Sequence, residues 1–538
     1  MRTENRTQYS RIAGMREPSI CGDRGGRRRY PNAAFAVAAL TLAGVSGRVM
    51  GAADVYIETS GSGATNEPPV GAVLVQRSDI LATVDAGGTF LLNTDDFDGP
   101  GDGEVIFARN ANFFFNNNSG TPGTFVIHAA GGVFTGEVGM LSNGNTPFNI
   151  EYHAGSPLTA NPLATADVNQ YGQSLSTGGG YITFSAENQV RVRVPANSGG
   201  GAITMISRGA TNGSQIRFLR SNGYARSSNG AGLAGPIVLQ ADSFYVNSSA
   251  LADANPRIDA DGAGGVVTIF PYHDSEISLG DGGAGLNLFS ALAARTRAET
   301  LNVGNPEATS RNDSGISVHS VNMAHIGTTV FNPRYAGAVQ LVGTSEFANV
   351  RVDADETGSL NFNIRDDGAG EAIADTMSAA DFTNTNGVAE LSVEIDNGVS
   401  VSVGDHFTLI DYETFGGGFA NVGDEELLKV NGYSILIDYN EDLGGGNLAL
   451  TATICDDGSS PDSDNDGAPD SCDVCPNRKP GDIDGDASVS ISDAAAFSGV
   501  LLAPNEAGAD AFCAADLNRD GAVNSLDIQP FMESILNP

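Results

Sequence analysis

Between residues 54 and 453 the chain repeats short runs of apolar or alternating residues, separated by Gly, Asn, Asp and Ser. The runs are four to seven residues long, and clear examples are residues 124–127, 181–184, 190–194, 202–206, 236–240 and 265–270. Alternation over such lengths between turn-forming residues predicts β-strands. Residues 288–300 are the one stretch of this region whose pattern indicates a helix.

Two architectures accommodate several hundred residues of short strands: a series of β-sandwiches or one solenoid. Sandwiches would have larger aromatic cores and turn signals every 8 to 12 residues or so. Here the runs begin at irregular intervals of about 15 to 30 residues, as expected when each coil adds strands to stacked sheets. We therefore predict a mainly β protein whose body, residues 54–453, is a parallel β-helix. Gly and Asn then suit the corners, because those positions often need a positive φ.

The first 53 residues have the organisation of an export signal. Basic residues ending in Arg27, Arg28 and Arg29 precede an apolar stretch, residues 33–45, and the small residues Gly51-Ala52-Ala53. A basic start, a short apolar run and a small-residue exit predict a secretory signal peptide. We expect a mature chain that begins between residues 52 and 54 and is secreted or held at the cell surface.

Charge excludes several classes of partner. The chain carries 65 acidic and 28 basic residues, a formal net charge of −37. Long-range repulsion therefore argues against binding to nucleic acid or to an anionic lipid surface. No apolar run reaches the roughly 18 to 20 residues of a membrane-spanning helix, so no transmembrane segment is predicted.

Part of the body resembles a known family. Residues 276–280 (EISLG), 284–288 (AGLNL) and 299–304 (ETLNVG) resemble a repeat of filamentous-haemagglutinin-like exoproteins. That resemblance implies a right-handed β-helix and an adhesin-like role. Residues 388–453 are similar to the terminal coil of autotransporter-like β-helices, which implies capping coils at the end of the body.

The four cysteines that remain after the signal lie close to the C-terminus. They are Cys455, Cys472, Cys475 and Cys513, and an even number in an exported protein predicts two disulfides with three alternative pairings. The acidic segment around them, residues 454–479, resembles a thrombospondin type 3 repeat. That resemblance implies a calcium-binding linker with the ligands Asp462, Asp464, Asp466, Asp470 and Asp473.

The last 59 residues, 480–538, contain two 12-residue loops with oxygen-bearing side chains at alternate positions. The first places Asp482, Asp484, Asp486, Ser488, Ser490 and Asp493 at positions 1, 3, 5, 7, 9 and 12. The second places Asp516, Asn518, Asp520, Ala522, Asn524 and Asp527 at the same positions. Odd positions converge on one cation, and position 7 supplies its backbone carbonyl. We predict Ca²⁺ as the cofactor of both loops.

Each loop runs into an apolar helix, expected at residues 494–502 and 528–536. One helix per loop, with Asp at position 12, resembles a dockerin type I module. The resemblance implies a cohesin-like protein or another extracellular scaffold as partner. It also implies that positions 10 and 11, Ile491, Ser492, Ser525 and Leu526, contribute to the choice of that partner.

No catalytic residue is predicted in the body. Its acids, such as Asp259 and Asp353, are expected to form glycine-rich turns, and Arg191 and Arg193 alternate along a strand and are expected to face solvent. The six histidines show no metal-ligand spacing. We therefore predict a secreted, calcium-binding, adhesin-like protein. The alternative is an enzyme, a polysaccharide lyase or glycoside hydrolase, because a dockerin-like tail also suits such an enzyme. A polysaccharide is a possible ligand of the body.

Overall fold

A computed structural model describes most of the chain after the predicted signal. The described residues are 54–58, 71–97, 102–108, 112–136, 138–144, 146–155, 158–159, 162–209, 214–304, 306, 313–333, 337–354, 358–444, 447–456, 460–465, 468–473, 475–518 and 521–536. The predicted signal, residues 1–53, lies outside them. Within these ranges no helix has both the length and the apolar character that crossing a bilayer requires.

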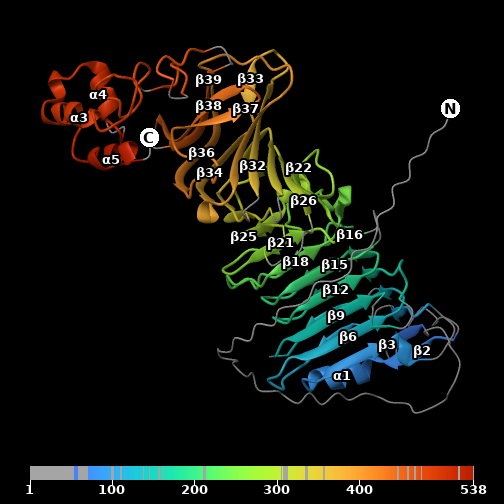
Figure 1. Ribbon diagram of the computed structural model, residues 1–538. Coiled ribbons are helices and arrows are strands. Elements are labelled where there is room, and N and C mark those ends of the chain that lie inside the picture. The colour runs from blue at the N-terminus through green and yellow to red at the C-terminus, as the bar shows by residue number, and fades with distance from the viewer. Residues whose placement is uncertain are drawn as a thin grey trace, which may run out of the picture. The chain divides into compact units, whose positions relative to one another are not determined.

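The body is mainly β and is built from sheets of mostly parallel strands, which we number I to IV (Figure 1); β33 (Ala372–Ala374) of sheet IV is antiparallel to β32 (Ser359–Asp366). Sheet I contains β1 (Val55–Glu58), β2 (Val73–Gln76), β4 (Val105–Phe107), β7 (Val133–Phe134), β10 (Val168–Gln170), β13 (Gln189–Val192), β16 (Gln215–Phe218) and β19 (Ser243–Val246). Sheet II contains β5 (Phe113–Phe115), β8 (Met140–Ser142), β11 (Leu175–Ser176), β14 (Ala196–Asn197), β17 (Ala225–Arg226), β20 (Ile258–Ala260) and β24 (Thr296–Ala298).

Sheet III follows the whole body. Its parallel strands are β3 (Thr89–Asn93), β6 (Gly123–Ala129), β9 (Phe148–Ala154), β12 (Ile182–Ala186), β15 (Ile203–Ser207), β18 (Ile237–Gln240), β21 (Val266–Phe270), β25 (Thr300–Val303), β27 (Asn322–Met323), β28 (Thr328–Phe331), β30 (Thr344–Phe347), β31 (Asn349–Val352), β34 (Thr376–Asn384) and β36 (His406–Gly416). Sheet IV contains β22 (Ser275–Gly280), β23 (Leu286–Leu288), β26 (Asp313–His319), β29 (Ala338–Val342), β32 (Ser359–Asp366), β33 (Ala372–Ala374) and β35 (Glu390–Ile395).

The order of the strands explains the parallel pairing. From β4 to β21 the chain visits sheets I, II and III in turn, and each strand pairs in parallel with the equivalent strand of the next turn. Ile182 of sheet III pairs with Ile150 before it and with Ile203 after it, so successive turns differ in length. Parallel sheets connected in this order fit a β-helix-like fold.

The core is a set of stacked apolar ladders between the sheets. Ile150, Ile182, Ile203 and Ile237 occupy one register of sheet III, and all four are completely buried. In the next inward register the rings of Tyr152 and Phe184 stack with centroids 5.5 Å apart. Parallel pairing places like residues on top of one another, so each turn buries its apolar side chains against the turns on either side.

Glycine triplets turn the chain from sheet II into sheet III. Gly178 and Gly179 have φ of 66° and 114°, which an L side chain rarely adopts. A Cβ added at Gly180 would lie 1.9 Å from the carbonyl oxygen of Phe148, and one at Gly201 would lie 2.3 Å from the oxygen of Gly180. The corners are glycine-rich for two reasons: a positive φ, as expected from the sequence, and the close approach of stacked backbones.

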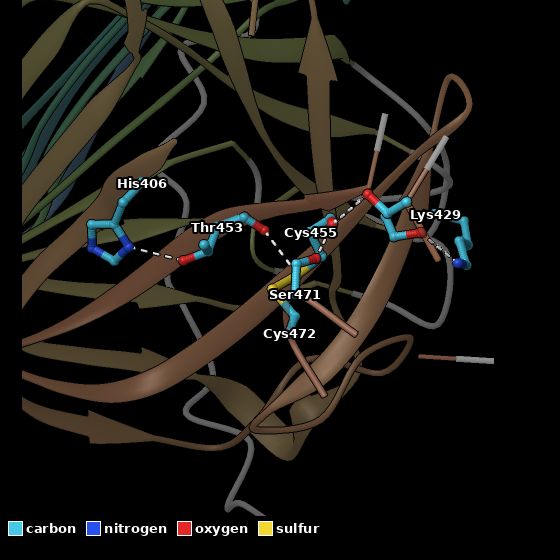
Figure 2. The surroundings of a disulfide bond; sticks show 8 residues. His406, Lys429, Thr453, Cys455, Ser471 and Cys472 are labelled. Atoms are coloured by element: carbon cyan, nitrogen blue, oxygen red, sulfur yellow. Dashed lines mark hydrogen bonds between the residues drawn. A yellow bond between two sulfur atoms is a disulfide. The ribbon is translucent and has the colours of Figure 1, made fainter. Parts of the chain in front are cut away.

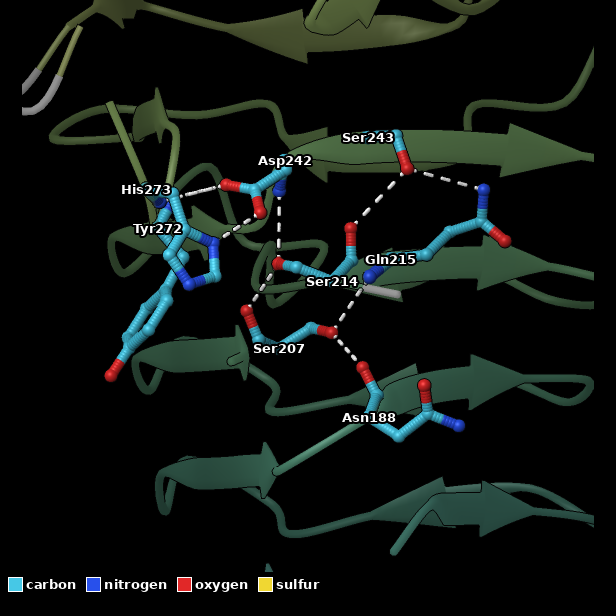
Figure 3. Close-up of polar contacts among 8 residues, drawn as sticks. All are labelled: Asn188, Ser207, Ser214, Gln215, Asp242, Ser243, Tyr272 and His273. Atoms are coloured by element: carbon cyan, nitrogen blue, oxygen red, sulfur yellow. Dashed lines mark hydrogen bonds and ion pairs between the residues drawn. The ribbon is translucent and has the colours of Figure 1, made fainter. Parts of the chain in front are cut away.

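Buried polar side chains connect the turns at another corner (Figure 3). Ser207 accepts a 2.7 Å hydrogen bond from the amide of Gln215, and Ser214 accepts a 3.0 Å bond from the amide of Asp242. Asp242 in turn accepts bonds from the amides of Tyr272 and His273, at 3.0 and 2.8 Å. These bonds satisfy backbone groups that the corner removes from the sheet ladders.

Three parts of the body differ from the sequence prediction. The helix expected at residues 288–300 is wrong: α2 covers only Ser290–Ala293, and β24 follows. A helix that was not predicted, α1 (Arg77–Asp85), buries Ile80 and Val84 at the start of the body. Asp259 lies in strand β20 and not in a turn.

Short 3₁₀ turns occur in the body at η1 (Thr94–Asp96), η2 (Ser248–Ala250) and η3 (Thr385–Gly387).

The parallel arrangement ends in antiparallel strands within residues 388–453 and just beyond them. β36 pairs in parallel with β34 but antiparallel with β39 (Asn447–Asp456). β39 continues antiparallel to β38 (Tyr433–Gly444), which pairs with β37 (Glu426–Val430). A hairpin on the last parallel strand covers an edge that would otherwise expose unpaired backbone groups.

The C-terminal segment is helical and has a small core of its own. It contains α3 (Asp493–Leu502), η4 (Pro504–Glu506), α4 (Ala509–Ala515) and α5 (Ile528–Leu536). Phe497 of α3 and Phe531 of α5 stack with ring centroids 4.2 Å apart, and both are almost fully buried. The two predicted helices are present, and α4 between the loops was not predicted.

Candidate metal centre and its surroundings

Loop 1, residues 482–493, folds around the carboxylates at its two ends. Asp482, at position 1, accepts hydrogen bonds from the amides of Gly485 and Ala487 at 2.8 and 2.9 Å. Asp493, at position 12, accepts from the amides of Asp484 and Ser490 at 3.0 and 2.9 Å. Asp493 is completely buried and Asp482 is 3% exposed. The loop is thus held by the carboxylates that would also bind the cation.

Three acids of loop 1 converge. Ligand oxygens of Asp482, Asp484 and Asp486 all lie within 4.8 Å of one another, and no other trio of acids, histidines or cysteines does so in the described part of the chain. Desolvation, together with the nearby carboxylates of Asp493, Asp486 and Asp482, raises the pKa of Asp484. Carboxylates that repel one another at this distance fit a hard divalent cation that takes six to eight oxygens at about 2.3 to 2.6 Å.

Loop 2, residues 516–527, repeats the same hydrogen bonds. Asp527, completely buried at position 12, accepts from the amides of Asn518 and Asn524 at 3.1 and 2.8 Å. Asp516, at position 1, accepts from the amide of Gly521 at 2.9 Å, and its second carboxylate oxygen is buried without a hydrogen-bond partner. An unsatisfied buried carboxylate oxygen at position 1 fits a cation ligand. Asp520 lies outside the described residues.

The loops differ at position 6. Ala487 has φ of 69°, whereas the equivalent residue of loop 2 is Gly521, with φ of 79°. The left-handed region is strained for a residue with a Cβ, by about 1 to 2 kcal/mol. Loop 1 therefore folds with backbone strain that loop 2 does not have.

Relieving that strain is expected to strengthen calcium binding. Ala487→Gly should stabilise the folded loop by about 1 kcal/mol, which raises the calcium affinity of loop 1 roughly fivefold. Calorimetric titration measures the change. Ala522→Gly is the matched control, since it removes the same methyl group from a position without positive φ; an equal gain from both substitutions would contradict the explanation.

Positions 10 and 11 of both loops face solvent. Ile491 is 73% exposed and Leu526 is 64% exposed, and Ser492 and Ser525 beside them are also exposed. Each loop thus presents one large apolar residue and one serine. Ile491 is at position 10 of loop 1 and Leu526 at position 11 of loop 2, and these two exposed apolar side chains form a candidate contact surface.

The linker acids do not form a comparable group among the described residues. Asp470 accepts two hydrogen bonds of 2.7 Å from Ser463, and the amide of Cys475 donates to Asp473 at 2.8 Å. The Ser463 hydroxyl and amide lower the pKa of Asp470. Asp462 and Asp464 belong to no trio of converging acids, and Asp466 lies outside the described residues.

Two disulfides tie the linker to its neighbours. Cys455, at the end of β39, is bonded to Cys472, and Cys475 is bonded to Cys513 of α4, with Cα–Cα distances of 5.4 and 5.7 Å. Figure 2 shows the first bond, where Ser471 donates a hydrogen bond to the carbonyl of Cys455. Of the three pairings open from the sequence, the structure has Cys455–Cys472 with Cys475–Cys513, so neither bond closes the short Cys472–Cys475 segment.

Opening the second disulfide is expected to destabilise the C-terminal segment. Cys475 and Cys513 are 38 residues apart, and closing a loop of that length stabilises the folded state by about 4 kcal/mol in the chain-entropy model. The Cys475→Ser/Cys513→Ser variant should therefore unfold at lower denaturant concentration. Urea unfolding followed by hydrogen exchange of α3 and α5 measures this; an unchanged midpoint would contradict the prediction.

Comparison with protein families assigns this region. Residues 480–536 match the Dockerin type I domain. Dockerin type I domains bind Ca²⁺ through EF-hand-like loops, so the predicted cofactor is confirmed. No curated protein matches the chain. The dockerin module accounts for both loops, their helices and Cys513, but not for the body.

A cluster of titratable residues on sheet III was missed by the sequence analysis. His128 and His153 are direct partners in adjacent strands, and their rings stack with centroids 4.8 Å apart. Glu151 lies 3.4 Å from His153 and accepts a hydrogen bond from the Tyr181 hydroxyl. No sequence motif marks this cluster, since its members come from three turns of unequal length.

The charge states of this cluster follow from its contacts. The hydrogen bond from His153 lowers the pKa of Glu151, and burial together with the bond to Glu151 raises the pKa of Tyr181 to about 12. Burial and the neighbouring His153 lower the pKa of His128. At neutral pH the cluster therefore combines a carboxylate, a protonated phenol and a neutral imidazole, which can donate and accept protons.

Proposed function

We propose that this is an exported attachment protein: a right-handed parallel β-helix with an adhesin-like role, anchored by its dockerin module. The observation that carries the proposal is the pair of calcium loops within a dockerin type I match, because such domains bind cohesin partners. Proteins that carry them are typically extracellular or cell-surface proteins. Two disulfides near the module suit an oxidising compartment.

The proposal assigns each segment a task. Residues 1–53 direct export, and residues 54–453 form the β-helix, of which 388–453 cap the end. Residues 454–479 form a calcium-binding linker of thrombospondin type 3 character. Residues 480–538 form the dockerin module, in which Ile491, Ser492, Ser525 and Leu526 contact the cohesin-like partner.

Partner binding by the full mature chain tests this function. The chain should bind an immobilised type I cohesin domain in calcium and release it in chelator. Replacing the exposed apolar residues, Ile491→Asp with Leu526→Asp, should weaken binding at least about tenfold, since a charge replaces apolar contact at the centre of the surface. Leu233→Asp, at a leucine of the body that is 58% exposed, is the matched control. No binding to a cohesin panel in calcium would refute the attachment function.

A second candidate function is cleavage of a polysaccharide. The cluster of Glu151, Tyr181, His153 and His128 supports it, because a carboxylate, a phenol and an imidazole in one half-buried group can serve as acid and base. Incubation of the mature chain with a polysaccharide panel, followed by assay of new reducing or unsaturated ends, tests it. Glu151→Gln should abolish product. His406→Ala, at a His–Glu pair with a distance of 3.1 Å elsewhere in the body, should leave product formation unchanged.

A further inference from the structure

Basic residues gather in one part of an acidic chain. Residues 152–241 contain six arginines and two acids, a local net charge of +4, whereas the whole chain carries −37. The arginines are Arg191, Arg193, Arg208, Arg217, Arg220 and Arg226. Three of them pair with acids, Arg191 with Asp167, Arg208 with Glu187 and Arg226 with Asp259, so the charge that no ion pair of the described residues neutralises lies at Arg193, Arg217 and Arg220.

The register of sheet I sets part of this charge in a row. Asn169 of β10, Arg191 of β13, Arg217 of β16 and Tyr245 of β19 are successive Cα partners. Phe134 of β7 precedes Asn169 in the same row. Arg191, Arg217 and Tyr245 of this row lie on the outer face, beside buried residues such as Val190, Val192 and Phe244, whereas Asn169 is itself buried. Its members are spaced about 4.8 Å apart, the distance between neighbouring strands.

Tyrosine rings hold the guanidinium groups in place. Arg217 lies 4.3 Å from the ring centroid of Tyr245, and Arg193, just after β13, lies 4.0 Å from that of Tyr171. Arg226 of sheet II lies 4.7 Å from the ring of Tyr224. A guanidinium stacked on a ring keeps its N–H edge directed outward, which is the edge that binds carboxylate or sulfate groups in a bidentate manner.

Two of these cations form no ion pair among the described residues. Arg191 pairs with Asp167 at 2.8 Å and Arg226 with Asp259 at 2.6 Å. No ion pair involves Arg193 or Arg217 within the described ranges, and the Nε of each is buried without a hydrogen-bond partner. Arg217 donates a 3.1 Å hydrogen bond to Gln189. Neither arginine is neutralised by an ion pair in the described ranges, which leaves charge for an anion from outside.

We propose that this row, with the stacked pair Arg193–Tyr171 at the ends of its strands, binds a linear anionic polysaccharide. Its repeated anionic groups match cations that recur from strand to strand, and the apolar faces of its sugar rings suit Phe134 and Tyr245, which is 38% exposed. Carboxylated and sulfated glycans share this chemistry. The binding site is independent of the dockerin module and of the Glu151 cluster, and it supplies a ligand for the body.

Binding of the full mature chain to defined polymers tests the proposal. The probes are polygalacturonate, dextran sulfate, uncharged dextran and polyacrylate, and the measurement is calorimetric titration at low and moderate salt. At least one of the two anionic glycans should bind, and its affinity should fall as the salt concentration rises. The ratio of the affinities for polygalacturonate and dextran sulfate shows whether the site prefers carboxylate or sulfate groups. Dextran should not bind.

Two variants and a control locate the site. Arg193→Gln with Arg217→Gln should lower the affinity for the anionic glycan at least about tenfold, because two charge-assisted contacts are lost. Tyr245→Ala removes a ring but no charge, and should weaken glycan binding while leaving polyacrylate unaffected. Arg351→Gln, at an exposed arginine that binds Asp353 in another turn, should change nothing.

Three results would overturn the proposal. They are failure of both anionic glycans to bind, polyacrylate binding as tightly as the glycans, and equal losses in the Arg351→Gln control and the double variant. If circular dichroism shows that the double variant is unfolded, the glycan affinity of the Tyr245→Ala variant alone tests the location of the site. Cohesin binding, measured in the same preparations, should be unaffected by each of these substitutions.

Discussion

Removing calcium with a chelator is expected to unfold residues 480–536 while the strands of the body keep their hydrogen bonds. The loops collect Asp482, Asp484 and Asp486, whose carboxylate oxygens lie within 4.8 Å of one another and repel when no cation is present. The core that remains is small and is centred on Phe497 and Phe531. Calcium at 100 times its dissociation constant stabilises the folded state by about 2.7 kcal/mol, so its removal should decide whether this module folds.

Hydrogen exchange of the full mature chain measures the effect. Amides of α3 and α5 should lose protection about a hundredfold or more in chelator. Amides of β12 and β15 serve as the internal control and should remain protected. Protection of α3 and α5 that does not depend on calcium would show that the helices fold on their apolar core alone.

The two loops should not contribute equally to this stability. We expect Asp516→Ala to weaken calcium binding more than Asp482→Ala, because loop 2 has Gly521 at the position where loop 1 strains Ala487. Loop 2 also has Asn518 where loop 1 has Asp484, which reduces repulsion near the cation, and Asn524 offers an amide oxygen where loop 1 has the hydroxyl of Ser490. Calorimetric titration of both variants gives the order. The reverse order would mean that carboxylate number outweighs backbone strain.

In the body, Phe184→Ala is expected to lower the free energy of unfolding by about 3 to 5 kcal/mol. Phe184 is completely buried and stacks on Tyr152 of the preceding turn, while Met205 follows it in the next turn. Its removal leaves a cavity that the stacked backbones cannot close. Thr183→Ala, on the same strand but facing outward, should change the free energy by less than about 0.5 kcal/mol.

Urea unfolding of the mature body, followed by tyrosine fluorescence and far-ultraviolet circular dichroism, measures both variants. A loss for Phe184→Ala that is no larger than that of Thr183→Ala would contradict the inward ladder. Separate transitions for the two ends of the body would show that turns stabilise only their neighbours, as in other stacked arrays.

The parts of the structure that could be predicted from the sequence are those encoded locally. Each calcium loop needs only 12 consecutive residues, so Asp482 and Asp493 could be assigned positions without knowing the fold. Strands such as Val190–Val192 could be recognised by alternation. Strands of two residues, such as β11, are too short to show apolar–polar alternation. The path of the chain through three sheets in each turn could therefore not be predicted.

Contacts between turns could not be predicted. The helix expected at residues 288–300 was wrong because its apolar residues face the core from two short strands and a single helical turn. His128, His153 and Tyr181 meet only because turns of unequal length bring them together. Likewise Arg193 and Tyr171 lie 22 positions apart, a separation that the irregular spacing of turns does not mark.

The disulfides have a mechanical consequence for a chain that is pulled at its C-terminal end. The shortest covalent path from β39 to α4 runs through Cys455–Cys472, two intervening residues and Cys475–Cys513. A pulling force applied between α5 and the body would follow this path, so residues 456–471 and 476–512 would carry no tension along the backbone. Loop 1 and α3 lie within the unloaded segment. Reduction of both bonds would release chain that extends by up to about 3.5 Å per residue and would bring loop 1 into the line of force.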